Sequence, residues 1–311
     1  MGMGMDQAST QRLLVPNDKI VVVLDTAPTR ELAYAEDIPA WVNTFADMAR
    51  NGYSFSLADG TFAELFNQRV RGAITGEQLL KIIQRLELFL APNLPVLPGK
   101  RDLRGMLQLE CSGWDESECQ ALSQAAWLEL REHVAVVDGK GSPETILQQE
   151  RELWIDHFIS WQTQIKNMID RENAPSNTAA GVEPEPFDLE SKTQVVLQAM
   201  ENAQLTQDLI TPPMSVRNHL LNRYIWRQIV RSLKPERPYN PVSRKKRNDG
   251  IDADLYRFLI LPALVVTRDK AFLSGLADIN SFQTGWFLSP EDLAQKWLDG
   301  TKPAPTWPGY P

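Results

Sequence analysis

Four acidic residues, set far apart in the sequence, occupy positions from which carboxylates could bind a divalent metal ion. They are Asp25, Glu64, Asp252 and Asp269. Asp25 closes the apolar run KIVVVLD and Asp269 closes the run ALVVTRD, so each follows a predicted buried strand. In an open parallel sheet the carboxyl ends of the strands form the edge at which ligands bind. Because Mg²⁺ and Mn²⁺ prefer carboxylate oxygens as ligands, we expect a metal site at this edge.

Two further acids, Asp249 and Asp254, lie beside Asp252 in the segment NDGIDADLYRFL and are alternative or additional ligands. Ordinary structural roles are also open for these residues. Acids in the first turn of a helix are favoured by the helix dipole alone. Glu64 stands three residues after a threonine, so it could complete a capping box, and Asp25 could simply begin a turn. The four acids in this order nevertheless favour metal chemistry, because without a cation their charges would repel.

Composition limits the alternatives. The chain has 311 residues, of which 43% are hydrophobic and 23% are charged, as expected for a globular protein with one large or two modest domains. No apolar run approaches the ~20 residues of a membrane-spanning helix, and no signal pattern opens the chain, so we expect a cytoplasmic protein. Two cysteines and three histidines without ligand spacing argue against a disulfide framework or a zinc site; they are Cys111, Cys119, His133, His157 and His219.

The hydrophobic pattern predicts an α/β fold. Apolar residues at 19–24 are continuous and β-branched, which is typical of a strand covered on both faces. Further strands are expected at residues 53–57, 94–99, 261–269 and 284–288. Helical spacing of apolar residues predicts helices at 31–50, 61–70, 76–90, 116–133, 142–170, 189–209, 216–233, 251–259 and 271–276, and a terminal helix that Ser289 caps.

The order of these elements predicts one α/β domain that is interrupted by helices. We expect an N-terminal arm at residues 1–18, a first part of the domain at 19–104, a helical insert at 105–243 and a second part of the domain at 244–311. The C-terminal segment would complete the sheet, so its removal should destroy the fold.

The acidic motifs resemble those of the PIN-domain nucleases over roughly residues 18–100 and 244–298. The shared features are LDT after the first strand, a glutamate in the helix after the second strand, ND-x-x-D at the start of a helix, and VTRDK followed by an aromatic residue. The resemblance implies a three-layer fold with a central, mainly parallel sheet and one or two Mg²⁺ or Mn²⁺ ions. It also implies catalytic acids that bind the metal and two flanking hydroxyl residues, namely Asp25, Glu64, Asp252 and Asp269, with Thr26 and Thr267.

A basic segment could supply the nucleic-acid contacts. The formal net charge is -8 and the pI is about 5.1, yet residues 217–247 contain ten Lys and Arg residues and only one acid, Glu236. A local basic surface can bind phosphate despite an acidic total. Arginines at every fourth position would line one face of a helix, although the same stripe could be a solvated face paired with acids of the insert. The expected nucleic-acid-binding residues are Arg223, Arg227, Arg231, Arg244, Lys245, Lys246, Arg247 and Arg268.

These features predict a metal-dependent endonuclease that hydrolyses phosphodiester bonds, with RNA as the expected substrate, of the toxin, defence-effector or RNA-processing kind. The alternatives are a non-catalytic PIN-like protein that binds a protein partner, or itself, through the helical insert, and a structure-selective DNA nuclease. The sequence has no phosphate-binding glycine-rich loop and no G-x-S-x-G motif, which argues against a P-loop nucleotidase and a serine hydrolase.

Overall fold

The computed structural model describes residues 14–15, 19–107, 114–135, 143–173, 214–233, 238–243, 246 and 248–307. The chain divides into two compact units. The first unit contains residues 1–141, 261–268 and 286–305, and the second contains residues 142–260, 269–285 and 306–311. Each unit is described below by itself.

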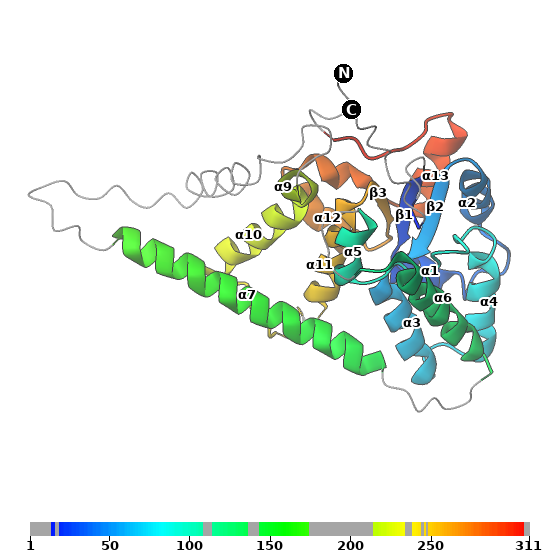
Figure 1. Cartoon of the computed structure of the whole chain (residues 1–311), viewed down its shortest axis with the longest axis horizontal. Coiled ribbons are helices and arrows are strands. Elements are labelled where there is room, and N and C mark those ends of the chain that lie inside the picture. The colour runs from blue at the N-terminus through cyan, green and yellow to red at the C-terminus, as the bar shows by residue number, and fades with distance from the viewer. Residues whose placement is uncertain are drawn as a thin grey trace, which may run out of the picture. The chain divides into compact units, whose positions relative to one another are not determined.

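A four-stranded sheet forms the centre of the first unit (Figure 1). Its strands are β1 (Ile20–Leu24), β2 (Tyr53–Leu57), β3 (Ala263–Val266) and β4 (Phe287–Leu288), in the order β2-β1-β3-β4. All three pairings are parallel, and in the register Val22 of β1 pairs with Phe55 and with Leu264. Every residue of β3 is buried, as expected for a parallel strand covered on both faces. The predicted α/β class and the mainly parallel sheet are therefore confirmed.

The strand expected at residues 94–99 is not formed as such. Only an isolated parallel bridge joins Val96 to Leu57, supported by a hydrogen bond from the Leu57 N–H to the Pro95 carbonyl. Pro95 and Pro98 lack the N–H groups that a sheet ladder needs, so a regular strand cannot form there. On the other side of the bridge the Ser123 hydroxyl accepts from the N–H of Val96 and donates to its carbonyl, which completes the edge of the sheet.

Seven helices of the described residues belong to the first unit. They are α1 (Thr26–Glu31), α2 (Ala40–Arg50), α3 (Asp59–Val70), α4 (Gly76–Leu86), α5 (Lys100–Met106), α6 (Glu116–Glu132) and α13 (Pro290–Leu298). Helix α6 thus lies in the first unit, although its sequence falls within the expected insert, and α5 crosses the expected start of that insert. Instead of the single helix expected at residues 31–50, α1 ends at Glu31, a loop follows, and α2 forms residues 40–50. Pro39 explains the break, because a proline disfavours helical geometry in the residue before it.

An aromatic core joins α2 to β2. Phe45 of α2 is fully buried; its ring stacks on Phe55 of β2 at a centroid distance of 4.8 Å and meets the edge of Phe89 at 5.6 Å. Trp41 and Met48 extend the same helix face, since residues at intervals of three and four lie on one side of a helix. Aromatic residues of this size supply much of the hydrophobic stabilisation of a core.

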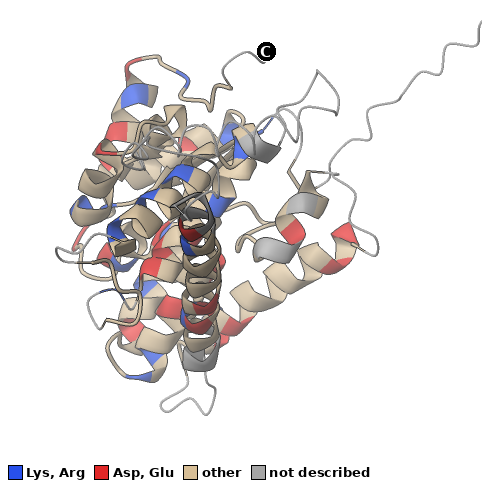
Figure 2. Ribbon diagram, turned by 90° about the vertical axis from the view of Figure 1, so that its left-hand side faces the viewer, with Lys and Arg blue, Asp and Glu red and all other residues tan. Residues whose placement is uncertain are grey.

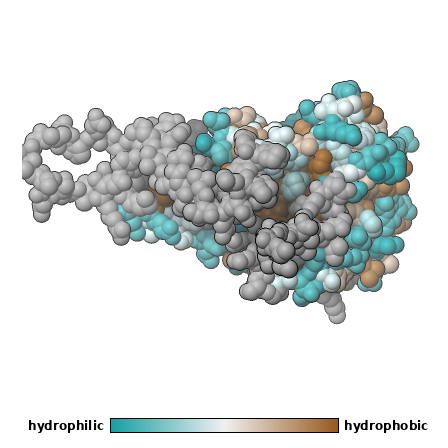
Figure 3. Space-filling model, turned by 45° about the horizontal axis from the view of Figure 1, so that its top comes forward, coloured by the Kyte–Doolittle hydropathy of each residue, from teal (hydrophilic) through white to brown (hydrophobic). Residues whose placement is uncertain are grey.

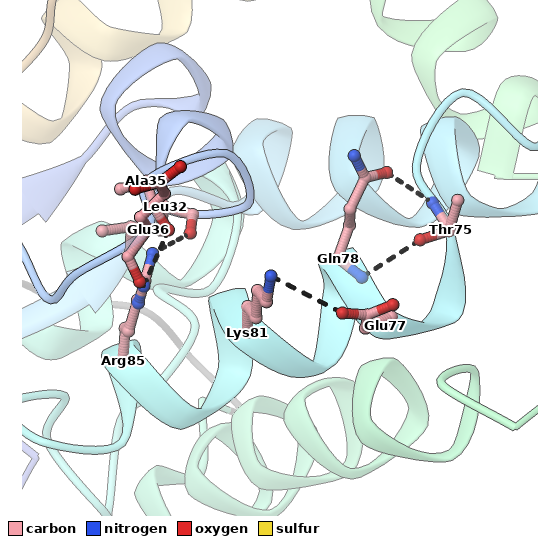
Figure 4. Close-up of polar contacts among 8 residues, drawn as sticks. All are labelled: Leu32, Ala35, Glu36, Thr75, Glu77, Gln78, Lys81 and Arg85. Carbon is pink, nitrogen blue, oxygen red and sulfur yellow. Dashed lines mark hydrogen bonds and ion pairs between the residues drawn. The ribbon is translucent and has the colours of Figure 1, made fainter.

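Helix α4 begins with the strongest local start signal in the first unit (Figure 4). The Thr75 hydroxyl accepts from the Gln78 N–H, while the Gln78 side chain accepts from the Thr75 N–H, which forms a complete capping box. Further along the helix, Lys81 and Glu77 form a solvent-exposed ion pair with an Nζ to Oε1 distance of 3.6 Å. Such exposed pairs contribute little to stability.

At the other end of α4, the buried guanidinium of Arg85 points into the loop that follows α1 (Figure 4). Its Nη2 donates to the carbonyls of Ala35 and Glu36 at 2.9 and 3.1 Å, and its Nη1 donates to the carbonyl of Leu32. These carbonyls lie at and beyond the C-terminal end of α1, where backbone acceptors have no partner within the helix. A side chain of α4 therefore fixes the end of α1.

The second unit is helical. Its elements are α7 (Pro143–Asn173), α9 (Met214–Arg217), α10 (His219–Leu233), α11 (Asp249–Arg257), η2 (Phe258–Ile260), α12 (Lys270–Ala277) and η3 (Phe282–Trp286). The long α7, α10 and α11 confirm the helices expected there, whereas the helix expected at 189–209 lies outside the described residues. At the closest approach of α7 and α11, a Cβ atom added to Gly250 would lie 2.5 Å from the Trp154 Cβ, so only glycine fits at this point.

Aromatic side chains fill the space between these helices. Trp154 and Phe158 of α7 are buried, as are Tyr224 of α10 and Tyr256 of α11. The rings of Tyr224 and Tyr256 lie 4.7 Å apart, and Trp154 lies 6.0 Å from Tyr224. Trp154 and Phe158 are therefore packing residues of the second unit.

Candidate functional site

Asp25 lies at the carboxyl end of β1, where it begins helix α1. As the N-cap residue, its Oδ1 accepts from the Thr26 N–H at 2.6 Å. Its other oxygen, Oδ2, accepts from the hydroxyl of Thr267 at 2.6 Å. Thr267 directly follows β3, so a side chain from the neighbouring strand fixes the orientation of the carboxylate.

Three buried threonines lie near the carboxyl ends of β1 and β3. Thr26, Thr61 and Thr267 all have side chains with little or no exposed surface. The Thr61 hydroxyl donates to the Leu24 carbonyl at 3.0 Å, and the Thr26 hydroxyl lies 3.4 Å from the Thr61 oxygen. These hydrogen bonds connect α1 and α3 to the ends of the central strands. They also give buried hydroxyl and carbonyl groups the partners that such groups need.

The strand order places Asp25 at a particular point of the sheet. The chain passes from β1 to β2 on one side and then returns across β1 to form β3 and β4 on the other side. The direction of winding therefore reverses between β1 and β3, and Asp25 and Thr267 lie at the carboxyl ends of these two strands. In open α/β sheets, ligands bind in the crevice outside the carboxyl ends of the strands at such a switch point.

Glu64, the second predicted ligand, lies on the second turn of α3 and is half-buried. The alternative of a capping box formed by Thr61 and Glu64 is wrong. Helix α3 begins at Asp59, its N-cap residue is Ala58, and Thr61 lies inside the first turn.

Arg268 follows Thr267 and is held by two carboxylates of the first unit. Its Nη1 lies 2.8 Å from Oε2 of Glu31, the last residue of α1. Its Nη2 donates to Glu291, which lies in the first turn of α13. The predicted nucleic-acid-binding residue is thus ion-paired at the carboxyl edge of the sheet. No sequence pattern pointed to Glu31 or Glu291 here, because both lie far from Arg268 along the chain.

In the second unit, Asp249 is buried and belongs to a polar network. The Tyr239 hydroxyl donates to Asp249 Oδ2 at 3.0 Å, and Lys246 Nζ lies 3.5 Å from the same oxygen. The Trp154 Nε1 donates in turn to the Tyr239 oxygen at 3.3 Å. Burial raises the pKa of the Asp249 carboxyl, while the charge of Lys246 and the Tyr239 hydrogen bond oppose that rise. These contacts give Asp249 an internal structural role.

The remaining predicted acids also lie in the second unit. Asp252 is half-buried in the first turn of α11, and Asp254 pairs with Arg257 Nε at 2.9 Å. Asp269 is the N-cap residue of α12, where its Oδ1 accepts from the Phe272 N–H at 2.9 Å. Asp252 and Asp269 thus lie at helix starts, where negative charge is favourable.

The arginines expected to form a basic stripe on α10 make contacts within the second unit. Arg227 donates to the Gly275 carbonyl of α12, Arg231 to the Gln228 side chain, and the Arg223 Nε–H to the ring of His219 at 3.1 Å. Acidic and basic residues are interspersed along the described ribbon (Figure 2). Arg244, Lys245 and Arg247 lie outside the described residues.

Cysteine chemistry is disfavoured at Cys119. Burial, followed by the charges of Asp102 and Glu116, raises the pKa of its thiol to about 12. The thiol therefore stays protonated at neutral pH and is a poor nucleophile.

Within the described ranges, no three side chains of His, Cys, Asp and Glu gather into a group that could hold a metal ion. None of the helices in these ranges is both long enough and apolar enough to span a membrane. Comparison with protein-family models, with characterised proteins and with solved structures finds no match to this chain.

Proposed function

We propose that this chain is a metal-dependent endonuclease of the PIN type that hydrolyses phosphodiester bonds, with RNA as its substrate. The observation that carries this function is the Asp25 carboxylate at the switch point of a parallel sheet, oriented by the Thr267 hydroxyl. An acid that is fixed by neighbouring donors at the ligand-binding edge of an α/β sheet is well suited to hold a cation.

The topology of the sheet supports the expected three-layer organisation. If the bridge at Val96 is counted as a rudimentary strand beside β2, the spatial order of the parallel strands becomes third, second, first, fourth and fifth along the chain. This is the order found on the two sides of the switch point in doubly wound folds.

The ligand chemistry fits a hard divalent cation. Asp25 offers carboxylate oxygens, and the donors nearby in the first unit are hydroxyls and backbone groups, which suit Mg²⁺ or Mn²⁺ better than zinc. Within the first unit, the proposed ligands are Asp25 and Glu64. A bound ion would position and acidify a water molecule and neutralise charge on the phosphate. Thr267 and the Thr26 N–H hold the Asp25 carboxylate in one orientation, and Asp249 and Asp254 support the fold.

The rate at which the Asp25→Asn variant cleaves RNA, compared with that of the wild type, tests this function. We expect cleavage of labelled RNA in Mn²⁺ or Mg²⁺ to fall by about two orders of magnitude or more, as when another charge-stabilising group is removed from an active site. Asp37→Asn, which changes an exposed acid in the loop before α2, is the matched control and should leave the rate unchanged. Equal rates in Asp25→Asn and the wild type would exclude the assignment, and parallel DNA substrates would reveal the structure-selective DNA nuclease alternative.

A second candidate function is that of a protein that binds a partner. Helix α7 exposes two large apolar side chains, Leu153 and Ile159, at 44% and 47% of their surface. The visible described surface is mostly hydrophilic, with scattered hydrophobic residues (Figure 3). If purified protein neither cleaves nucleic acid nor binds Mn²⁺ in calorimetry, this second function is favoured over the first.

A further inference from the structure

At the carboxyl edge of the sheet, the cationic side chain of Arg268 lies close to acidic side chains. Glu31 and Glu291 hold its guanidinium from α1 and α13, and Asp25 is held by the adjacent Thr267. Three carboxylates thus accompany one guanidinium in this part of the first unit. These three carboxylates repel an approaching phosphodiester unless one of them moves away from the guanidinium.

The guanidinium has the right chemistry for a phosphate. Its planar fork can donate two parallel hydrogen bonds to phosphate oxygens in the same way as to a carboxylate. Its Nε–H is buried and has no hydrogen-bond partner among the described residues, so the present pairing leaves one donor unsatisfied. Carboxylate and phosphate are therefore alternative partners for the same group.

Both ion pairs can open readily, so that Arg268 can exchange a carboxylate partner for another anion. The side chains of Glu31 and Glu291 are 51% and 56% exposed, whereas that of Arg268 is 30% exposed. Exposed ion pairs contribute little to stability, because water solvates the separated charges well. Each carboxylate can turn to solvent at small cost while Arg268 stays at the edge.

We infer that Arg268 is the phosphate-binding side chain of the candidate site, and that Glu31 and Glu291 compete with the phosphodiester backbone for it. The two glutamates thereby weaken binding of any nucleic acid that lacks further contacts. This inference rests on the proposed function, since it concerns the same edge of the same sheet.

Equilibrium binding separates this competition from catalysis. The probes are short, fluorescently labelled single-stranded RNA and single-stranded DNA, which share the phosphodiester backbone, and EDTA removes metal so that metal-dependent cleavage cannot occur. Glu31→Gln and Glu291→Gln should each tighten binding about two- to fivefold, which is the range of an exposed ion pair. The double variant should bind about tenfold more tightly, while Arg268→Gln should bind more weakly than the wild type.

Two controls show whether the tighter binding depends on Arg268. Glu77→Gln removes the same charge from the exposed Lys81 pair on α4, so it reports the effect of net charge alone. The glutamate variants are also combined with Arg268→Gln, in which the gain should disappear. If Arg268→Gln does not fold by circular dichroism, Arg268→Lys replaces it; this variant keeps the charge but loses the fork and should show a reduced gain.

The inference is overturned if the gain persists without the Arg268 guanidinium, if Glu77→Gln gives an equal gain, or if Arg268→Gln binds as the wild type does. If the variants change RNA and DNA binding equally, the shared phosphodiester backbone is the ligand. If they change the binding of only one polymer, the site also recognises a feature of that polymer. Metal-dependent cleavage is measured separately. Cleavage without the predicted binding pattern would reject the competition for Arg268 but support the nuclease function. The predicted binding pattern without cleavage would support the competition and reject the nuclease function.

Discussion

Thr267 is the side chain on which the orientation of Asp25 depends most directly. Thr267→Val keeps the shape of a fully buried residue but removes the hydroxyl that donates to Asp25 Oδ2. Loss of a group that orients a metal ligand typically lowers metal affinity or activity about 10- to 100-fold. We expect Mn²⁺-dependent cleavage to fall within that range, and Thr267→Ser to retain most of it. A Thr267→Val enzyme with full activity would show that the hydroxyl serves packing alone.

His219 makes the second unit sensitive to acid. Its Nε2 faces the Arg223 Nε–H donor, and its Nδ1 lies 2.8 Å from the Ser281 hydroxyl, so the ring is held in its neutral form. Burial, together with the charge of Arg223, lowers the pKa of His219 from its ordinary value of 6.5 to about 4. Between these values the unfolded chain binds more protons than the folded chain. The free energy of unfolding therefore falls as the pH drops through this window.

We expect this effect to be about 1 kcal/mol after allowance for solvent screening at a partly exposed ring. Urea unfolding at a series of pH values between 4 and 6.5 measures it. His219→Gln cannot take up the proton, so its stability should change less over the same range. Parallel pH dependence in the two proteins would contradict the assignment.

Among the elements, α1 is a helix of only six residues that is fixed at both ends. Asp25 caps its start, and Arg85 of α4 donates to three carbonyls at and beyond its end (Figure 4). Isolated helices of this length are not stable in water, so these tertiary contacts must hold it. The start of α1, and with it Asp25, therefore depends on a residue of another helix.

Replacement of Arg85 tests this dependence. Arg85→Met fills a similar volume but leaves one buried and two partly buried carbonyls without this donor, and we expect a loss of about 2 to 4 kcal/mol in the free energy of unfolding. Arg85→Lys can reach fewer of these carbonyls and should be intermediate. Chemical denaturation with tryptophan fluorescence provides the measurement, and Lys81→Met on the exposed face of α4 is the control, with an expected change below about 0.5 kcal/mol. A change in Arg85→Met as small as that of the control would show that the loop after α1 is held by other contacts.

For the whole molecule, the closing segment is as important as the first strand. Residues 286–305 of the first unit supply β4 and α13, and the Trp297 Nε1 of α13 donates to Asp47 of α2 at 2.9 Å. The Tyr53 hydroxyl of β2 donates to the Pro303 carbonyl at 3.0 Å. A segment near the end of the chain thus contacts elements that precede it by about 250 positions.

Truncation after residue 285 should therefore abolish cooperative folding of the first unit. It removes the partner of β3 and exposes the buried faces that α13 covers. We expect loss of the cooperative thermal transition in circular dichroism and early elution in size-exclusion chromatography. A truncated chain that melts cooperatively near the wild-type temperature would show that the segment is dispensable.

The amino-acid sequence was sufficient where the signal is local. The unbroken apolar run at residues 20–24, the helix at α6, and the cap at Ser289 followed by Pro290 all formed where the pattern indicated. In each case the choice depends on propensity, on hydrophobic period or on a cap residue, all of which act over a few neighbours. Pro39 and Pro95 are also local signals, and greater weight on them would have predicted the break before α2 and the irregular edge at residues 94–97.

Tertiary structure alone decided which distant groups meet. Asp25 was recognisable as the end of a strand, and Thr267 was placed within the strand expected at residues 261–269, but only the parallel pairing of β1 with β3 brings the hydroxyl to the carboxylate. No spacing along the chain joins Arg268 to Glu31 and Glu291, and no helical pattern marks Arg85 as a donor to the loop after α1. Such contacts follow from strand order and helix packing, because the free energy that fixes them is the burial of the whole core and not the preference of any one segment.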